Sequence, residues 1–169
     1  MQQSRLGGRI LDSRTVRFGS DGTQAALFTL AGTGAGAGRQ SSIFDLGAYR
    51  PWSVSWQAQC EFATAPVLGE TVDLYIVRSS DSLGTIVDGD LGAVDAAIAT
   101  IDTLRNLARG KLGSLVAQTN LVTPLPQSSG DWVILARYII IAAWNYSALD
   151  ALSGTAANNF VDLTFHLGG

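Results

Sequence analysis

The sequence predicts a mainly β protein, a jelly-roll-like antiparallel β-sandwich with one inserted helix and an extended N-terminal arm. Three observations lead to this prediction. Several segments alternate apolar and polar residues with the period of a half-buried strand. Glycine is abundant, with 19 residues, and charged residues make up only 15 % of the chain, against about 25 % in an average soluble domain. Only one segment has helical periodicity, whereas a parallel α/β fold needs a helix between most of its strands.

The N-terminal region is basic and precedes a mildly acidic body. Its arginines are Arg5, Arg9, Arg14 and Arg17, opposed by Asp12 alone. We therefore divide the chain into an extended arm, residues 1–20, and a single β-sandwich domain, residues 21–169, although residues 9–18 also carry a weak strand signal. Polar termini that contain glycine are usually disordered unless something holds them. We expect another subunit to hold this arm; the alternative is a solvated tail.

Two neighbouring segments show the clearest strand patterns. One places five apolar residues on a single face: Val54, Trp56, Ala58, Cys60 and Phe62. In the other, residues 71–78, Val72, Leu74 and Ile76 face one way, and Asp73, Tyr75 and Val77 face the other. Because only a short turn separates these segments, we expect them to form an antiparallel hairpin. Further strands are expected near residues 25–30, 42–46, 112–119 and 160–167.

The longest apolar run is Trp132–Asn145, WVILARYIIIAAWN. Its β-branched and aromatic content favours a strand over a helix, and the run is too short to span a bilayer. A strand that is apolar on both faces must be covered on both faces. The sandwich core provides one cover; a helix, a loop or a neighbouring subunit must provide the other. We expect other copies or a larger shell to contribute this second cover.

One segment, residues 91–109, has the period of an amphipathic helix. Its apolar residues recur at spacings of three and four, with Asp90 as a candidate N-cap and Gly110 as a candidate stop. These apolar residues are Val94, Ala97, Ile98, Ile101, Leu104 and Ala108.

No pattern in the chain predicts a catalytic, cofactor or metal site. The glycines of residues 32–37 resemble a dinucleotide fingerprint, but no helical period follows them, as that site requires. One cysteine and one histidine are too few for a zinc site. Cys60 falls on a core-facing position, and His166 on the outward face of the last strand. Asp88-Gly-Asp90 begins like a calcium loop but lacks the glycine and the acid that such a loop needs downstream.

Composition excludes further classes. The net charge of −3 does not suggest a nucleic-acid partner, no apolar window is long enough for a membrane span, and no secretory signal is visible. We therefore expect a protein that is not an enzyme. Three tryptophans at strand ends or in turns, Trp52, Trp132 and Trp144, can bind a partner or a sugar, or can simply close the end of the sandwich. With the four arginines they form the predicted partner-binding set.

The second half of the chain carries an ordered series of features. TVDLYIVRSSD comes first, then Leu112-Gly-Ser-Leu-Val, then ARYIIIAAWNYSALDALSG, and finally FVDLTFHL. The third feature contains an Asn-x-Ser turn and an "aLs" segment, namely Asn145, Ser147, Leu152 and Ser153. From Thr71 to Leu167 this order resembles a group of small structural proteins of tailed bacteriophages.

The resemblance implies a virion protein with a jelly-roll-like sandwich and no catalytic residues. It favours a decoration or cement protein on the capsid surface, made in the host cytoplasm. Its expected partners are other copies of itself, with a trimer favoured, and the major capsid protein or another virion protein; neither nucleic acid nor membrane is expected. Alternatives are a tail, baseplate or fibre-attachment protein, a carbohydrate-binding module that uses exposed aromatics, and last a hydrolase.

Overall fold

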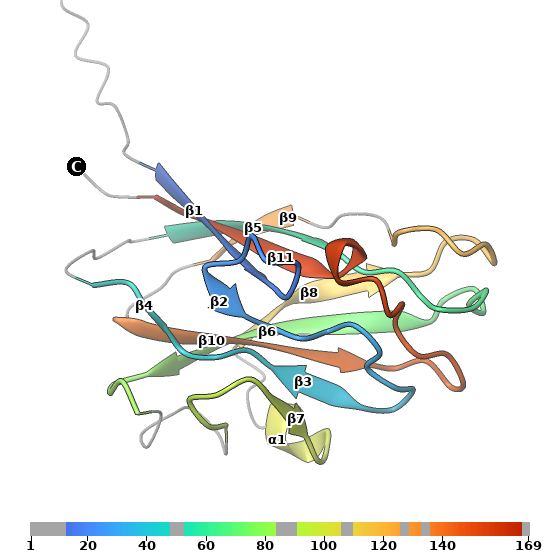
Figure 1. The fold of residues 1–169 in the computed structure, drawn as a ribbon, viewed down its shortest axis with the longest axis horizontal. Coiled ribbons are helices and arrows are strands. Elements are labelled where there is room, and N and C mark those ends of the chain that lie inside the picture. The colour runs from blue at the N-terminus through green and yellow to red at the C-terminus, as the bar shows by residue number, and fades with distance from the viewer. Residues whose placement is uncertain are drawn as a thin grey trace, which may run out of the picture.

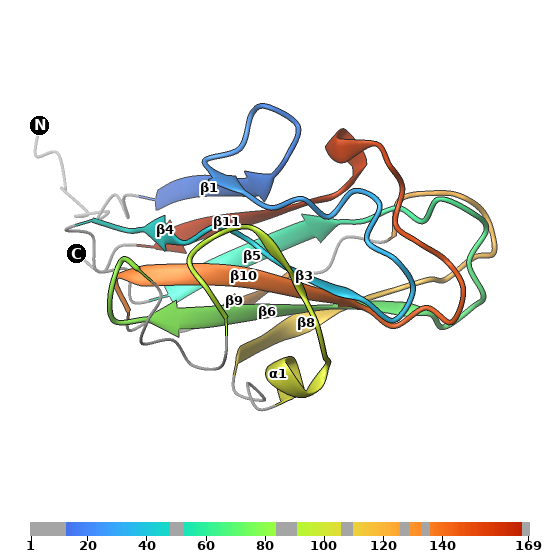
Figure 2. The same ribbon diagram turned by 60° about the horizontal axis from the view of Figure 1, so that its bottom comes forward.

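A computed structural model of the chain describes residues 13–47, 53–83, 91–105, 110–125, 129–132 and 136–166, without the side chains of 129, 131 and 132. Two β-sheets lie face to face in it (Figures 1 and 2). The first part of the chain forms β1 (Ser13–Gly19), β2 (Ala26–Leu27), β3 (Gly38–Gln40), β4 (Phe44–Asp45), β5 (Ser53–Gln59) and β6 (Thr71–Ser79). The second part forms β7 (Ala96–Ile98), α1 (Asp102–Arg105), β8 (Lys111–Val116), β9 (Ser129–Trp132), β10 (Tyr138–Asn145), the 3-10 helix η2 (Ala156–Asn158) and β11 (Phe160–His166).

Each sheet is built from strands that lie far apart in sequence. Within the described residues, sheet A has the order β2-β1-β11-β5-β9, and sheet B has the order β7-β3-β10-β6-β8, with β4 also paired to β10. All pairings are antiparallel except the short one between β1 and β2. The predicted mainly β fold with antiparallel sheets and a helix is confirmed, and the jelly-roll connectivity remains a prediction.

The core between the sheets follows the predicted alternation. Val54, Trp56 and Ala58 of β5 point into it from sheet A, and Val72 and Leu74 of β6 point into it from sheet B. Cys60 and Phe62, which continue the β5 pattern, are also fully buried. The period-two pattern decides the orientation of these residues, because a shift of one residue would expose the whole apolar set.

Strand β10 is apolar on both faces, and both faces are buried. Ile139, Ile141 and Ala143 belong to the core between the sheets. Ile140 and Ala142 face outward into a second hydrophobic cluster. The remaining members of this cluster are Tyr75, Val77, Leu91, Ile98, Leu104 and Trp144.

The second cluster is covered by the chain's own residues 91–105, which we call the cover segment. It carries β7, which pairs with β3 at the edge of sheet B, and α1, which lies on the side of sheet B that points away from sheet A (Figures 1 and 2). Leu91, Ile98 and Leu104 pack from it onto the sheet. Each such side chain contributes roughly 1.5–3 kcal/mol when fully buried. The expectation that other copies or a shell must cover β10 is therefore wrong for this strand, since its three isoleucines are 0 % exposed in the single chain.

Asp95 fastens the cover segment to the sandwich. Its carboxylate accepts hydrogen bonds from Arg39 Nε at 2.9 Å and Nη2 at 2.8 Å, and from the Thr29 amide at 3.2 Å and hydroxyl at 2.6 Å. Gln40 adds two more bonds, because its Nε2 donates to the carbonyl oxygens of Gly92 and Val94 at 2.7 and 2.8 Å. Burial opposes ionisation of Asp95, but the hydrogen bonds from Arg39 and Thr29 outweigh it and lower the pKa of this carboxyl.

These contacts explain why the helix predicted over residues 91–109 does not form along residues 91–101; residues 106–109 lie outside the described residues. Residues 96–98 form a strand instead, paired with β3, and the only helical turn of the described residues in this segment is Asp102–Arg105. Val94, on the expected apolar face, is 68 % exposed. Helical periodicity is a weak signal where β-branched residues and a glycine lower helix propensity, and here the bonds of Asp95 and Gln40 fix an extended backbone.

Two strand predictions also need correction. Strands β5 and β6 do not form a hairpin, because β5 pairs with β11 and β9 whereas β6 pairs with β10 and β8. Their apolar faces meet across the core instead of lying side by side in one sheet. The run Trp132–Asn145 is likewise not one strand: Trp132 ends β9 in sheet A, and β10 begins at Tyr138 in sheet B.

The N-terminal prediction changes as well. Residues 13–19 of the predicted arm form β1, which pairs along its length with β11 of the same chain. Arg14 and Arg17 therefore belong to the sandwich domain. Arg5 and Arg9 lie outside the described residues, so the arm that stays a prediction is residues 1–12.

One glycine of the glycine-rich tract is required by close packing. A β-carbon on Gly38 would lie 2.5 Å from Trp144 Cε3 and 2.9 Å from the carbonyl oxygen of Ala143. Gly38 pairs directly with Trp144 in the sheet. The tract thus leads into a strand that must approach a large ring, and not into a helix that could bind phosphate.

We predict that Asp95→Asn destabilises the fold by about 2 kcal/mol, because it weakens charge-assisted hydrogen bonds to Arg39. The pKa of Asp95 is lowered in the folded state, so its stabilisation is present above the unfolded-state pKa and is lost as pH falls through the folded-state value. Urea unfolding from pH 7 towards acid should show the difference between wild type and variant shrinking. Hydrogen exchange should speed up first in the cover segment.

The matched control is Asp102→Asn. Asp102 also pairs with an arginine, Arg105, but its side chain is 78 % exposed, and exposed pairs contribute roughly 0–1 kcal/mol. Equal destabilisation by both variants would contradict the role assigned to Asp95.

We also predict that Gly38→Ala destabilises the fold by about 1–3 kcal/mol, the usual cost of forcing an extra carbon into a packed region. Gly34→Ala is the control in the same tract, since a β-carbon there meets nothing within 4 Å. Thermal unfolding of both variants gives the comparison, and a neutral effect at position 38 would show that the ring of Trp144 can move aside.

Candidate functional site

Three connections between the sheets meet at one end of the sandwich, which we call the loop end. They are the β5–β6 connection, the chain after β8, and the β10–β11 connection, all at the end opposite the start of β1 and the finish of β11 (Figure 1). Hydrogen bonds tie them together: the Leu125 amide donates to the Cys60 carbonyl at 2.6 Å, and the Ala63 amide donates to the Ala151 carbonyl at 2.9 Å. The loop end is therefore a connected surface.

The buried side chain of Asn145 holds the backbone of the loop end in place through hydrogen bonds. Its Nδ2 donates to the carbonyl oxygens of Asp150 at 2.8 Å and Gly34 at 3.2 Å, and its Oδ1 accepts a bond from the Ser147 amide at 3.0 Å. Asn145 is 1 % exposed. The Asn-x-Ser residues that carry the phage resemblance are thus structural: they fold the β10–β11 connection onto the glycine-rich tract.

The loop end carries most of the exposed large apolar side chains of the described residues. Ten such side chains are exposed, and six of them lie on these three connections. The six are Val67, Leu68, Leu121, Val122, Tyr146 and Leu149. Isolated exposed apolar residues are ordinary, but a concentration of them at one end of a molecule indicates a contact surface.

Beside the loop end, the outer face of sheet B opens into a groove of about 660 Å³. Val67 and Leu68 line one part of it, and Tyr146 lines another. Asp73 is 6 % exposed, and its carboxylate accepts bonds from Lys111 Nζ and Ser114 Oγ, both at 2.5 Å. The sequence patterns did not predict this groove. The available signal was an acid, Asp73, on a strand face otherwise occupied by Tyr75 and Val77, together with the single lysine of the chain.

Glu70 holds the two walls of the groove together. Its Oε1 accepts a hydrogen bond from the Ala148 amide at 2.9 Å, and its Oε2 accepts one from the Val67 amide at 3.0 Å. The Tyr146 amide donates to the Thr71 carbonyl at 2.8 Å. These bonds fix the backbone on both sides of the groove before any ligand arrives.

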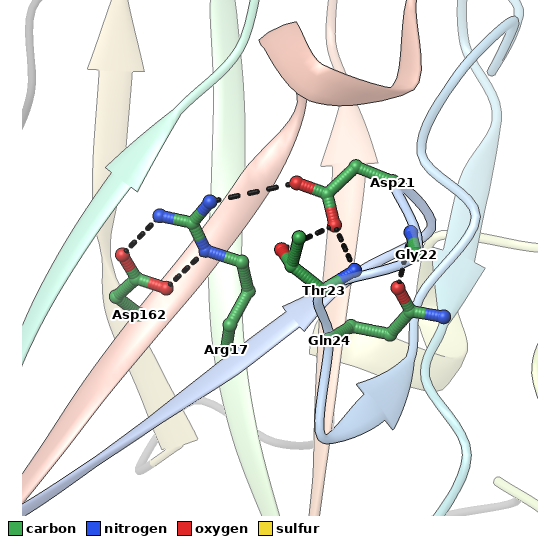
Figure 3. A network of polar contacts seen from close by, with 6 residues as sticks. All are labelled: Arg17, Asp21, Gly22, Thr23, Gln24 and Asp162. Carbon is green, nitrogen blue, oxygen red and sulfur yellow. Dashed lines mark hydrogen bonds and ion pairs between the residues drawn. The ribbon is translucent and has the colours of Figure 1, made fainter.

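Arg17, predicted to bind a partner, is engaged within its own domain (Figure 3). Its Nε and Nη2 donate to the two carboxylate oxygens of Asp162, each at 2.8 Å, and its Nη1 donates to Asp21 at 3.5 Å. The guanidinium also lies over the Phe160 ring, 4.0 Å from its centre. The hydrogen bond with Asp162 is the largest influence raising the pKa of Arg17. Arg17 therefore stabilises the pairing of β1 with β11.

The other predicted residues are scattered. Arg14 is exposed, and its guanidinium carbon lies 5.6 Å from the centre of the Phe44 ring. Trp144 is 6 % exposed in the cluster under the cover segment, so it closes the structure and offers no ring to a partner. Trp132 has its backbone in β9 opposite Val54. Arg5, Arg9 and Trp52 lie outside the described residues.

The chemically reactive residues occupy structural positions. Cys60 is fully buried, and burial raises the pKa of its thiol to about 12. His166 lies on the outer face of sheet A with its Nε2 2.9 Å from Ser55 Oγ. In the described ranges, no three His, Cys, Asp or Glu side chains gather closely enough to hold a metal ion. The described part of the chain also contains no helix with the length and apolar character that a membrane span requires.

No protein-family model matches the chain. A search of curated proteins also finds no matching sequence. The function must therefore be inferred from the chain's own residues and geometry.

We predict that Asn145→Ala destabilises the protein by about 2–4 kcal/mol, because it leaves several buried polar groups without partners. Chemical denaturation measures this cost, with Asn120→Ala, at an exposed position of the same end, expected within about 0.5 kcal/mol of wild type. Retained stability of the Asn145 variant would mean that water replaces these bonds without loss.

Proposed function

We propose that this protein is a structural component of a tailed-phage virion, a decoration or cement protein on the capsid surface. The observation that carries the proposal is the loop end, where three connections present six exposed apolar side chains. The resemblance of residues 71–167 to small phage structural proteins supports the same class. In this proposal the protein assembles with copies of itself, with a trimer favoured, and with the major capsid protein or another virion protein.

The proposed mechanism depends on buried area. Every 40 Å² or so of apolar surface removed from water contributes about 1 kcal/mol, whereas an exposed ion pair contributes roughly 0–1 kcal/mol. Burial of Leu121, Val122 and Leu149 at each of many copies in a shell would therefore contribute more binding free energy than single ion pairs do. The isoleucines of β10 play no part in these contacts, because Ile139 and Ile141 are buried between the sheets and Ile140 lies under the cover segment.

The loop end and the start of β1 lie at opposite ends of the molecule. Ser13 pairs with His166 at the end distant from the three connections (Figure 1). Residues 1–12, with Arg5 and Arg9, precede Ser13 in the sequence. A decoration protein of this design would contact one neighbour through the loop end and another through the arm.

We predict that the double variant Leu121→Asp, Val122→Asp abolishes binding to undecorated capsids of the cognate phage, measured by co-sedimentation. The control is Leu83→Asp, which places a charge at an exposed apolar position, 73 % exposed, that belongs to none of the three connections. Unchanged binding of the double variant, with its fold verified by circular dichroism, would contradict the loop-end contact. Selective binding to isolated tails would instead favour the tail or baseplate alternative.

A second variant tests the arm. Deletion of residues 2–12 preserves all of β1 and removes Arg5 and Arg9. We expect at least tenfold weaker capsid binding, about 1.4 kcal/mol, with the same melting temperature. Wild-type affinity after this deletion would show that the arm contributes nothing to attachment.

A further inference from the structure

The cover segment shields only part of the outer face of sheet B. It packs over Tyr75 and Val77 of β6 and over Ile140 and Ala142 of β10. Asp73, two residues before Tyr75 on the same face of β6, lies outside that cluster and lines the groove instead. One part of this sheet face is thus covered by the cover segment, and the adjoining part, where Lys111 and Ser114 contact Asp73, borders the groove.

Asp73 and Lys111 form a neutral pair beside the groove. Lys111 Nζ lies 2.5 Å from Asp73 Oδ2, and Ser114 Oγ donates to Oδ1 at the same distance. The Tyr75 hydroxyl donates to Oδ2 at 3.4 Å, and burial, followed by the charge of Asp73, raises the pKa of Tyr75. The carboxylate and the ammonium group each keep further hydrogen-bonding capacity. Asp73 and Lys111 thus place an acceptor next to a donor, and Glu70, which also lines the groove, adds a second carboxylate.

Apolar and aromatic surface completes the groove. Tyr146 is 39 % exposed, and its ring centre lies 6.4 Å from that of Trp144, with the two rings tilted by 58°. Val67 and Leu68, each 64 % exposed, border the same space. Because Glu70 and the backbone of Thr71 fix these loops, a ligand would meet a largely formed surface. A volume of about 660 Å³ lies in the usual range for small-molecule sites, roughly 300–1,000 Å³.

We propose that this groove binds a pyranose unit of a neutral carbohydrate. A pair of neighbouring sugar hydroxyls can donate to the Asp73 carboxylate and accept from the Lys111 ammonium group, while the apolar C–H face of the ring packs on Tyr146. Two carboxylates against one ammonium group disfavour an anionic ligand. A cationic ligand would find Asp73 already paired with Lys111 and both Glu70 oxygens already bonded to backbone amides, so an uncharged polyol fits the groove best. This inference does not rest on the proposed capsid role. The groove shares Val67, Leu68 and Tyr146 with the loop end, but the capsid test changes Leu121 and Val122, which do not line the groove.

The test is a titration of the full chain with neutral sugars, namely glucose, galactose, mannose, maltose and cellobiose, followed by amide chemical shifts in NMR. At least one sugar should produce saturable shifts centred on residues 67–73, 111–114 and 146–148. Tyr146→Ala and Lys111→Ala should each weaken binding by at least tenfold, and Tyr146→Phe, which retains the ring, should bind nearly as wild type does. No saturable shift with any of these sugars would overturn the proposal.

Two controls establish whether the groove itself holds the sugar. Tyr138→Ala removes an aromatic ring from the opposite end of β10 and should leave sugar affinity unchanged. The Leu121→Asp, Val122→Asp variant should also bind sugar normally, so a failure of capsid binding and a failure of sugar binding can be told apart. Equal affinity of wild type, Tyr146→Ala and Lys111→Ala, all with native spectra, would place any sugar site elsewhere and refute the inference.

Discussion

A sheet with two apolar faces must exclude water from both, and sheet B meets this requirement with a segment of its own chain. The bond between Asp95 and Arg39 is the central contact, since it joins the cover segment to β3 and leaves no buried carboxylate unpaired at that position. A charge in such a place stabilises only while it is fully hydrogen-bonded. The attachment point of the cover segment determines which residues form the second hydrophobic cluster. It also determines which part of the outer face of sheet B the segment covers.

This arrangement changes the meaning of the chain's most apolar stretch. The isoleucines of β10 suggest a surface that needs neighbours, yet the single chain buries them completely. The surface available for assembly lies at the loop end, where the apolar side chains belong to connections and not to strands. The strand residues form the buried scaffold, and the connections carry the exposed apolar side chains, a division common in β-sandwich proteins.

The strands and their facing directions could be predicted from sequence wherever polar and apolar residues alternate. The β5 pattern from Val54 to Phe62 and the β11 pattern from Val161 to Phe165 both correspond to buried inward faces. Alternation does not report which strands are neighbours, and for that reason β5 and β6 were expected in one sheet. Nor does it distinguish one long apolar run from two strands in different sheets, as with β9 and β10.

The cover segment and the groove could not be predicted either, because both depend on contacts between residues that are distant in sequence. Residues 91–105 have helical spacing, but their conformation depends on Thr29, Arg39 and Gln40, which are distant in sequence. The groove joins β6, β8 and the β10–β11 connection, so Asp73, Lys111 and Tyr146 meet only in the folded chain. Trp144 was expected at the rim because it lies at a strand end. The sequence does not show that Gly38, with no side chain, leaves room for the Trp144 ring beneath the surface.

The pairing of Ser13 with His166 has a practical consequence. Polypeptides fused ahead of β1 and after β11 would leave the sandwich from the same pole, side by side, and remote from the connections at the other pole. The domain is thus suited to display fused proteins on engineered particles. A protein fused at this end would point away from the surface that the opposite end binds.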